Sequence, residues 1–164
     1  MDSSGSQQLA AAVFTEIAWG SAAYHEAARL RHRLFYQEHG IPLEAMAAAR
    51  GAYHAALLHP LSRAVLAYGY LEQNSPDEFQ IYQMVVHPDC QSQGLGRRLL
   101  GALGREACHR GALTLMLHAR TTKLGFYQRS WFVATGAVFP SSVTGVPHIK
   151  MVKSLVSFHS PPAS

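Results

Sequence analysis

The most informative run of residues in this chain is Met84-Val85-Val86-His87-Pro88-Asp89-Cys90-Gln91-Ser92-Gln93-Gly94-Leu95-Gly96-Arg97-Arg98. Its first part completes an apolar segment that predicts a strand over 79–86, which Pro88 ends. After a polar loop, leucines recur at four-residue steps and predict a helix over 94–110. Because the first N–H groups of a helix have no acceptor inside it, a strand, a glycine loop and a helix in this order predict a phosphate site.

Strand-like and helix-like segments alternate on both sides of this run. Bulky residues predict a first strand over 13–19, and apolar residues at three- and four-residue steps predict a helix over 22–38 that follows an N-cap at Ser21. Further strands are predicted over 53–58, 64–72, 113–117, 132–138 and 148–155, and further short helices over 43–51 and 121–129. Short turns predict an antiparallel meander over 53–86, whereas the strand at 113–117 follows a helix and is expected to run parallel to its predecessor.

Composition predicts one folded domain, because 48% of the 164 residues are hydrophobic and only 15% are charged. We expect this domain to cover 9–156, with flexible tails at 1–8 and 157–164. No apolar run approaches the roughly 20 residues of a membrane span. The first residues carry no basic-then-apolar signal, so we expect a cytoplasmic protein. The formal net charge of +4 suits an anionic ligand without selecting one.

The two glycines of the loop permit a close approach between backbone and ligand, since Gly94 and Gly96 have no Cβ. Arg97 and Arg98 add positive charge at the same helix start. The loop is not a Rossmann fingerprint, because Leu99 stands where a third small residue is needed, and no G-K-[ST] follows as in Walker A. Tight packing of the loop would also explain two glycines, and this alternative stays open.

The loop resembles motif A of the GNAT acyltransferases, Q/R-x-x-G-x-G/A, through Gln91, Gly94 and Gly96. The segments Leu-His-Ala-Arg at 117–120 and Gly-Phe-Tyr-Gln-Arg at 125–129 resemble motif B of the same family. One such match would be weak, but these two occur in the family's order and spacing. The chain is therefore identified as similar to the GNAT family.

Two further segments resemble the ElaA-like subgroup of this family. Gly145–Met151 is similar to its ending G-x-P-H-x-x-M, and Leu30–Glu38 is similar to its segment L-R-x-x-V-F-x-x-E. The resemblance implies an α/β protein with the GNAT fold. Its sheet is expected to be mixed and mostly antiparallel, flanked by helices, with the parallel strands 79–86 and 113–117 splayed apart.

The resemblance also implies acetyl-CoA as co-substrate, bound where the parallel strands separate, and it implies no metal. Amides of the glycine loop would hold the pyrophosphate, and the backbone of Val85 and Val86 would bind the pantetheine arm. The implied cofactor-binding residues are Met84, Val85, Val86, Gln91, Ser92, Gln93, Gly94, Leu95, Gly96, Arg97, Arg98, Arg120, Phe126 and Tyr127.

The implied reaction is transfer of the acetyl group to a primary amine by direct attack in a ternary complex. Tyr127 occupies the family's general-acid position and is expected to protonate or stabilise the leaving thiolate. The acceptor stays open, and Glu38, His54 and Tyr82 are candidates to bind it. His148 is a candidate base or acceptor-site residue. Candidates for the base are His54, Tyr82, Glu78, His118 and His148.

The chain departs from the family pattern at several positions. Trp131 stands where the family has glycine, so a positive φ there would strain the backbone. Arg120 stands where many members have asparagine, and Gln83 where many have arginine. The segment 45–52 has no acidic residue where the subgroup has an acidic stretch, so a cationic acceptor would lose attraction there and the subgroup's substrate is not carried over.

Other functions remain to be weighed. A non-catalytic acyl-CoA sensor on the same fold stays open as the alternative to an enzyme. His25-Glu26 begins like the zinc motif H-E-x-x-H, but Arg29 stands where the second histidine should be. A nucleic-acid module is allowed by the charge, but no zinc spacing or aromatic RNA-binding motif is present. We therefore expect an amine acceptor, neither nucleic acid nor membrane as partner, and a monomer or homodimer.

Overall fold

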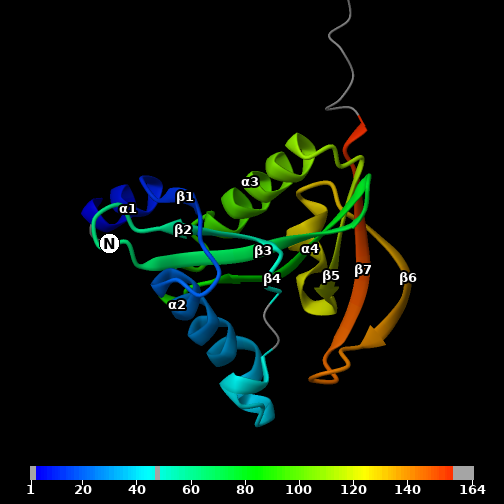
Figure 1. The fold of residues 1–164 in the computed structure, drawn as a ribbon, viewed down its shortest axis with the longest axis horizontal. Helices are drawn as coiled ribbons and strands as arrows, with labels where there is room; N and C mark the ends of the chain where they lie inside the picture. Colours follow the sequence, from blue (N-terminus) through cyan, green and yellow to red (C-terminus); the bar gives the residue numbers. More distant parts are fainter. Residues whose placement is uncertain (1–2, 47–48, 157–164) are drawn as a thin grey trace, which may run out of the picture. The chain divides into compact units, whose positions relative to one another are not determined.

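The computed structural model describes residues 3–46 and 49–156. Its strands are β1 Val13–Glu16, β2 Tyr53–Leu58, β3 Val65–Ser75, β4 Glu78–Val86, β5 Thr114–Arg120, β6 Val133–Pro140 and β7 Pro147–Ser154. Its α-helices are α1 Ser3–Ala10, α2 Ala22–Arg31, α3 Leu95–His109 and α4 Leu124–Gln128. The strands form one sheet in the order β1-β2-β3-β4-β5-β7-β6 (Figure 1).

The pairing confirms the predicted mixed sheet. β4 and β5 are parallel, with Glu78–Ile81 in register with Thr114–Leu117. β1 pairs antiparallel with β2, and β7 pairs antiparallel with both β5 and β6. β2, β3 and β4 are neighbours in the sheet, and the connections between them are too short for a crossover, so they form the predicted meander.

Two compact units make up the chain, and both β3 and β4 as well as α3 contribute to each. The first unit comprises 1–70 and 83–103, and the second comprises 71–82 and 104–164. A single domain over 9–156 stays a prediction. The C-terminal tail predicted at 157–164 and part of the helix predicted at 43–51 lie outside the described residues.

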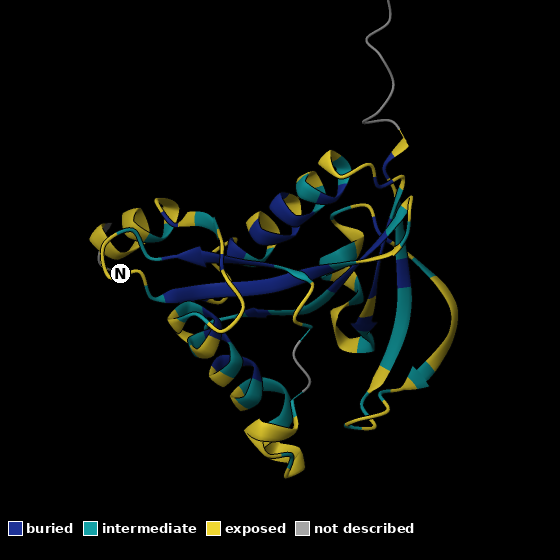
Figure 2. Cartoon of the chain, in the orientation of Figure 1, coloured by how far each residue is buried: buried dark blue, intermediate teal, exposed yellow. Residues whose placement is uncertain are grey.

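The core of the first unit forms where α3 crosses the sheet. The leucine stripe predicted for this helix is buried, as Leu99 and Leu103 are fully enclosed. A Cβ atom on Gly69 of β3 would lie 3.0 Å from Cγ of Met84 and 3.1 Å from Cδ1 of Leu103. Glycine therefore allows the helix to approach the sheet closely at this point, as the dark blue inner face of α3 indicates (Figure 2).

The second unit is built on alternation along β5. Leu115, Leu117 and Ala119 are buried, while His118 between them is exposed. A Cβ on Gly104 of α3 would lie 3.6 Å from Leu115, so the buried set faces the helix. The even-numbered residues of β5 therefore form the opposite face of the sheet.

Several segments differ from the predictions. The described part of the tail predicted at 1–8 belongs to α1, because tertiary contacts described below hold a helix that its Ser- and Gln-rich sequence signals weakly. The helix predicted over 22–38 keeps its length but changes from α2 to a π-helical turn at His32–Tyr36 and a 3₁₀ turn at Gln37–His39. β5 runs past its predicted end at 117 because β7 pairs with it as far as Arg120.

Other boundaries also moved. β1 ends at Glu16 rather than at 19, and the described part of the segment predicted as a helix over 43–51 contains a 3₁₀ turn at Leu43–Ala45. Ser21 caps α2 as predicted, since its Oγ accepts from the Tyr24 N–H at 3.2 Å. Within the described ranges, the helices are too short or too polar to cross a membrane.

Candidate functional site

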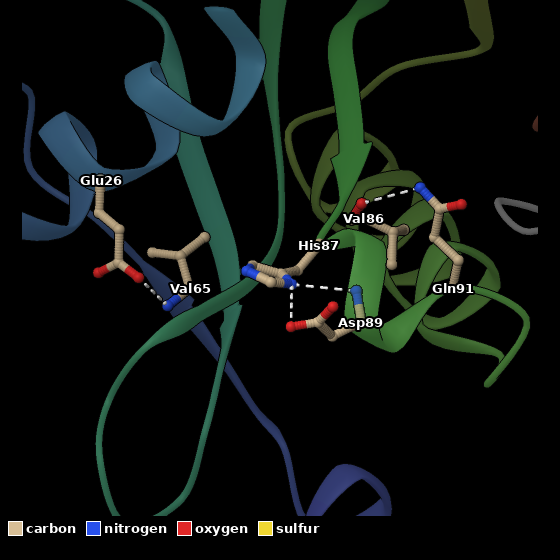
Figure 3. A network of polar contacts seen from close by, with 6 residues as sticks. All are labelled: Glu26, Val65, Val86, His87, Asp89 and Gln91. Atoms are coloured by element: carbon tan, nitrogen blue, oxygen red, sulfur yellow. Dashed lines mark hydrogen bonds and ion pairs between the residues drawn. The ribbon is translucent and has the colours of Figure 1, made fainter. Parts of the chain in front are cut away.

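The loop between β4 and α3 is held in shape by its own residues (Figure 3). A 3₁₀ turn at Pro88–Cys90 follows the strand. Nδ1 of His87 accepts from the Asp89 N–H at 3.2 Å, and the Cys90 N–H donates to the His87 carbonyl at 2.8 Å. Because Nδ1 carries the lone pair, its 3.8 Å contact with the Asp89 carboxylate is not an ion pair in this tautomer. Nε2 of Gln91 donates to the Val86 carbonyl at 3.3 Å.

Backbone donors accumulate after this turn. The first helical bond of α3 runs from the Arg98 N–H to the Gly94 carbonyl at 3.1 Å. No residue in the described part of the chain accepts from the amides of 91–97. Gly94 has a φ of +79° and open space around the position of a Cβ, and Ser92 has a φ of +63°. The result is a row of N–H groups without an acceptor among the described residues at a helix N-terminus, which is suited to an anion.

The two arginines at this helix start have different roles. Arg98 donates to the carbonyls of Leu9 at 3.0 Å and Ala12 at 2.8 Å, so it holds the C-terminal end of α1. The Arg97 side chain is exposed and makes no ion pair with any described residue. Arg97 is therefore the better candidate for a phosphate group.

Tyr127 lies on α4 between two phenylalanine rings. Its ring centroid is 4.9 Å from that of Phe126 and 6.1 Å from that of Phe132, both in edge contacts. Burial raises the pKa of Tyr127 to about 12. Its hydroxyl makes no hydrogen bond with the described residues, so it keeps its proton and remains available as a donor.

The turn after α4 keeps the shape that the family uses glycine for. Trp131 has a φ of +70°, and its N–H donates to the Gln128 carbonyl at 3.0 Å. The Phe132 N–H donates to the Tyr127 carbonyl at 3.2 Å, which completes a helix C-cap of the Schellman type. The Trp131 side chain is 80% exposed. The positive φ on which the strain expected for tryptophan depends is therefore present.

Two candidate bases lie on the even-numbered face of β5 and its neighbours. Phe139 of β6 has its ring centroid 5.0 Å from that of His118 and 6.2 Å from that of His148. Nδ1 of His148 lies 2.7 Å from the Val146 carbonyl. Because a carbonyl only accepts, Nδ1 carries a proton, so the neutral form of the His148 imidazole has its lone pair on Nε2. Burial, and then the charges of His148 and Lys150, lower the pKa of His118.

His54, another candidate base, is part of the core of the first unit. It is 3% exposed. Its Nδ1 lies 2.7 Å from the Tyr68 hydroxyl, and its Nε2 lies 2.7 Å from the Ala49 carbonyl. The Ala49 carbonyl accepts a hydrogen bond from the Nε2 N–H of His54. Nδ1 of His54 therefore accepts a hydrogen bond from the Tyr68 hydroxyl. Both ring nitrogens of His54 are therefore engaged, so neither is left to act as a base.

The remaining candidates are scattered. Glu38 has a side chain that is 71% exposed and pairs with His39 at 3.3 Å. Glu78 lies at the start of β4, where it accepts from Asn74 at 3.2 Å. Tyr82 hydrogen-bonds to Glu72, and burial followed by this carboxylate raises the pKa of Tyr82.

Sequence reasoning missed two charged residues near these candidates, Lys150 and Glu72. Lys150 is opposite His118 in the β5–β7 register. Arg120, which was predicted as a coenzyme contact, is opposite His148. Glu72 reaches Tyr82 from β3. No motif marks Lys150 or Glu72, and only the strand register could have identified them.

Glu26, the glutamate of the partial H-E-x-x-H match, has a structural partner. Glu26 accepts from the Val65 N–H at 2.9 Å and so joins α2 to β3 (Figure 3). Among the residues that the structure describes, no group of three His, Cys, Asp or Glu side chains could hold a metal ion. The H-E pair at 25–26 therefore serves packing.

Comparisons with known proteins identify the family. The model of the acetyltransferase (GNAT) domain matches residues 35–155. The uncharacterized N-acetyltransferase ycf52 of Gracilaria tenuistipitata var. liui is 27% identical over 94 residues, which cover 56% of this chain and 50% of the relative. The chain thus spans about half the length of this curated relative.

Solved structures show the same fold. Escherichia coli ElaA superposes with a TM-score of 0.70 at 18% identity, covering 87% of this chain and 99% of ElaA. An aminoglycoside 6'-N-acetyltransferase complexed with coenzyme A gives a TM-score of 0.70 at 16% identity, covering 93% of this chain and 99% of that one. The predicted GNAT fold is confirmed. Since the family model covers well over half of its residues, the chain belongs to the GNAT acetyltransferase family.

Proposed function

We propose that this chain is an N-acetyltransferase that moves the acetyl group of acetyl-CoA to a primary amine by direct attack in a ternary complex. The observation that carries the proposal is the row of amides at 91–97 that find no acceptor among the described residues. The oxygens of a diphosphate only accept hydrogen bonds, and the N-terminus of α3 favours negative charge. Family membership and the coenzyme A complex of a structural neighbour support the choice of coenzyme.

Different groups of this chain bind different parts of the coenzyme in this proposal. The amides of 91–97 take the diphosphate, and the Arg97 guanidinium takes the further phosphate at the adenosine end. The side chain of Met84 lies against Gly69 of β3, so this residue, like Val85 and Val86, contributes through its backbone. Coenzyme contacts of Arg120 and Phe126 stay predictions.

The acceptor must lose a proton before it attacks. An alkylamine with a pKa of about 10.4 is neutral in roughly one molecule in 2,500 at pH 7. We assign Nε2 of His148 as the base, because the Val146 carbonyl holds the proton on Nδ1. The amine nitrogen then forms the amide bond to the acetyl carbon, and the carbon–sulfur bond breaks.

Tyr127 assists the sulfur as it leaves. Full proton transfer from a hydroxyl with a pKa of about 12 to a thiolate with a pKa near 8.5 is uphill by roughly 5 kcal/mol. We therefore assign Tyr127 as a hydrogen-bond donor that stabilises the thiolate rather than as an acid that protonates it. The ring contacts with Phe126 and Phe132 fix the direction of the hydroxyl.

A glycine substitution tests the diphosphate site. Gly94→Val strains the backbone and brings a side chain over the amides, so we expect coenzyme A to bind at least tenfold more weakly in calorimetry. Gly20→Val is the matched control, because Gly20 also has a φ of +79° and open space around it. Equal affinity in the two variants would contradict the assignment.

Thiol release from acetyl-CoA in the presence of a panel of amines separates an enzyme from a sensor. We expect amine-dependent release of coenzyme A. Tight binding of coenzyme A without release for any amine would favour the acyl-CoA sensor instead. A cytoplasmic location and a monomeric or dimeric state stay predictions.

A further inference from the structure

The even-numbered face of the second unit gathers positive charge. Cross-strand register places His118 opposite Lys150, and Arg120 opposite His148, on the two paired strands β5 and β7 (Figure 1). Residues that are directly opposite in a sheet point to the same side. Their odd-numbered neighbours, such as Met151, are buried on the other side. Four basic side chains therefore share one surface, which we call the basic face: His118, Arg120, His148 and Lys150.

Negative charge is scarce around the basic face. The sequence has no aspartate or glutamate anywhere from 107 to 164, so α4, β5, β6 and β7 cannot supply a carboxylate. Among the described residues, Lys150 makes no ion pair. The nearest strand, β4, carries Tyr82 on the same side by alternation from Gln80, which pairs with Met116.

One carboxylate borders the basic face without neutralising it. Glu72 accepts a hydrogen bond from Tyr82. Glu72 and Tyr82 therefore form a negative edge beside a positive surface. A molecule that carries both an amine and an anionic group matches this distribution of charge.

The basic face is also rigid at its centre. Phe139 stacks on His148 with an interplanar angle of 28° and meets His118 edge-on at 77°. The bond from Nδ1 of His148 to the Val146 carbonyl fixes the second imidazole. The charged groups of the face are the Arg120 guanidinium and the Lys150 ammonium, and the ordered rings beside them reduce the side-chain entropy that is lost when an anion binds.

We propose that the basic face binds an anionic group, a carboxylate or a phosphate, that the amine acceptor carries. This inference rests on the proposed acetyltransferase function and narrows its substrate class. Polycationic amines are then poor acceptors, because they bring further positive charge to a surface that already repels it. Amino acids and phosphorylated amino alcohols are the chemical classes that meet the requirement.

Matched acceptors test the inference directly. The specificity constant kcat/KM is measured for glycine against glycinamide and for O-phosphoethanolamine against ethanolamine. We expect the anionic member of at least one pair to be favoured tenfold or more, and the favoured pair distinguishes carboxylate from phosphate. Transfer that is equal for both members of each pair, or fastest with spermidine, would overturn the inference while leaving acetyl transfer intact.

Removal of one positive charge tests whether the preference for anionic acceptors comes from the basic face. Lys150→Gln should raise KM for the favoured anionic acceptor at least tenfold, with kcat changed less than twofold, and should erase the preference over the uncharged partner. Arg105→Gln is the control, because it removes one exposed positive charge from α3, which packs on the other face of β5. An equal rise in KM for the two variants would mean that the acceptor responds only to the net charge of the protein, which would overturn the inference.

A binding measurement separates this inference from the proposed function. N-acetylglycine and N-acetylglycinamide are titrated by calorimetry into the protein saturated with coenzyme A. Tighter binding of the anion in the wild type and its loss in Lys150→Gln support the basic face even if no amine is turned over, in which case only the proposed function fails. Absence of any difference between the two compounds overturns the inference.

Discussion

The same residue type, histidine, has opposite roles in the two units of this protein. His54 in the first unit is enclosed, and both of its ring nitrogens are engaged, with Tyr68 and Ala49. His148 in the second unit is half-buried and uses only Nδ1, so Nε2 keeps its lone pair. His148 is therefore the better candidate base, because it keeps hydrogen-bonding capacity that His54 has used.

The largest effect is expected from replacing the histidine with the unused nitrogen. His148→Ala removes the proposed base, and general bases contribute roughly 10²- to 10⁴-fold. We expect kcat to fall by about 10³-fold while the free energy of unfolding changes by less than ~1 kcal/mol. Steady-state kinetics and urea unfolding measure the two quantities. A tenfold or smaller loss of kcat would remove His148 from the role of base.

Replacing the enclosed histidine is expected to have the reverse profile. His54→Ala leaves a cavity and deprives the Tyr68 hydroxyl and the Ala49 carbonyl of their partner. The free energy of unfolding should fall by about 3 kcal/mol. The fraction that remains folded should keep its kcat within twofold. A selective loss of turnover at unchanged stability would show that the histidine of the core takes part in the chemistry.

Tyr127→Phe tests the group proposed to stabilise the leaving thiolate, as the histidine variants test the base. Removal of a hydrogen bond to a thiolate should lower kcat by roughly 10- to 100-fold, because bonds to charged groups contribute about 1.5–3 kcal/mol. Affinity for coenzyme A should change far less than turnover. Since burial raises the pKa of Tyr127 to about 12, the kcat profile of the wild type should show no ionisation of this residue below about pH 11. A basic limb near pH 9 that disappears in the variant would contradict this assignment.

The smallest effect concerns backbone strain beside the same site. Trp131 has a φ of +70° and an exposed side chain, so Trp131→Gly loses little packing and relieves the strain. The free energy of unfolding should rise by about 1 kcal/mol. Gly136→Ala, which introduces a Cβ at a φ of +78°, should lower it. Destabilisation by Trp131→Gly would show that the indole makes a contact worth more than the strain.

Local patterns predicted the scaffold of this protein well. The four-residue spacing of Leu95, Leu99 and Leu103 predicted α3 because a buried helical stripe depends only on periodicity. The parallel pair followed from the helix between its strands. α1 was missed because its support comes from Arg98, far away in the chain, which donates to carbonyls at its C-terminal end.

The chemistry of individual side chains was less accessible from sequence. Both His54 and His148 were candidate bases, since a sequence does not show that a distant hydroxyl or a nearby carbonyl occupies a ring nitrogen. Lys150 and Glu72 were overlooked because the face of a strand depends on its register with strands elsewhere. Motif spacing located the glycine loop, whose role depends on backbone amides and not on side chains.

Calorimetric titration with coenzyme A and with pantetheine tests the diphosphate site most directly, because pantetheine shares the thiol arm but lacks both phosphates of the bridge. With amides 91–97 as the donors, coenzyme A should bind in the micromolar range and pantetheine at least a hundredfold more weakly, the difference shrinking in Gly94→Val. Equal binding of the two compounds, or no heat with coenzyme A, would contradict the account.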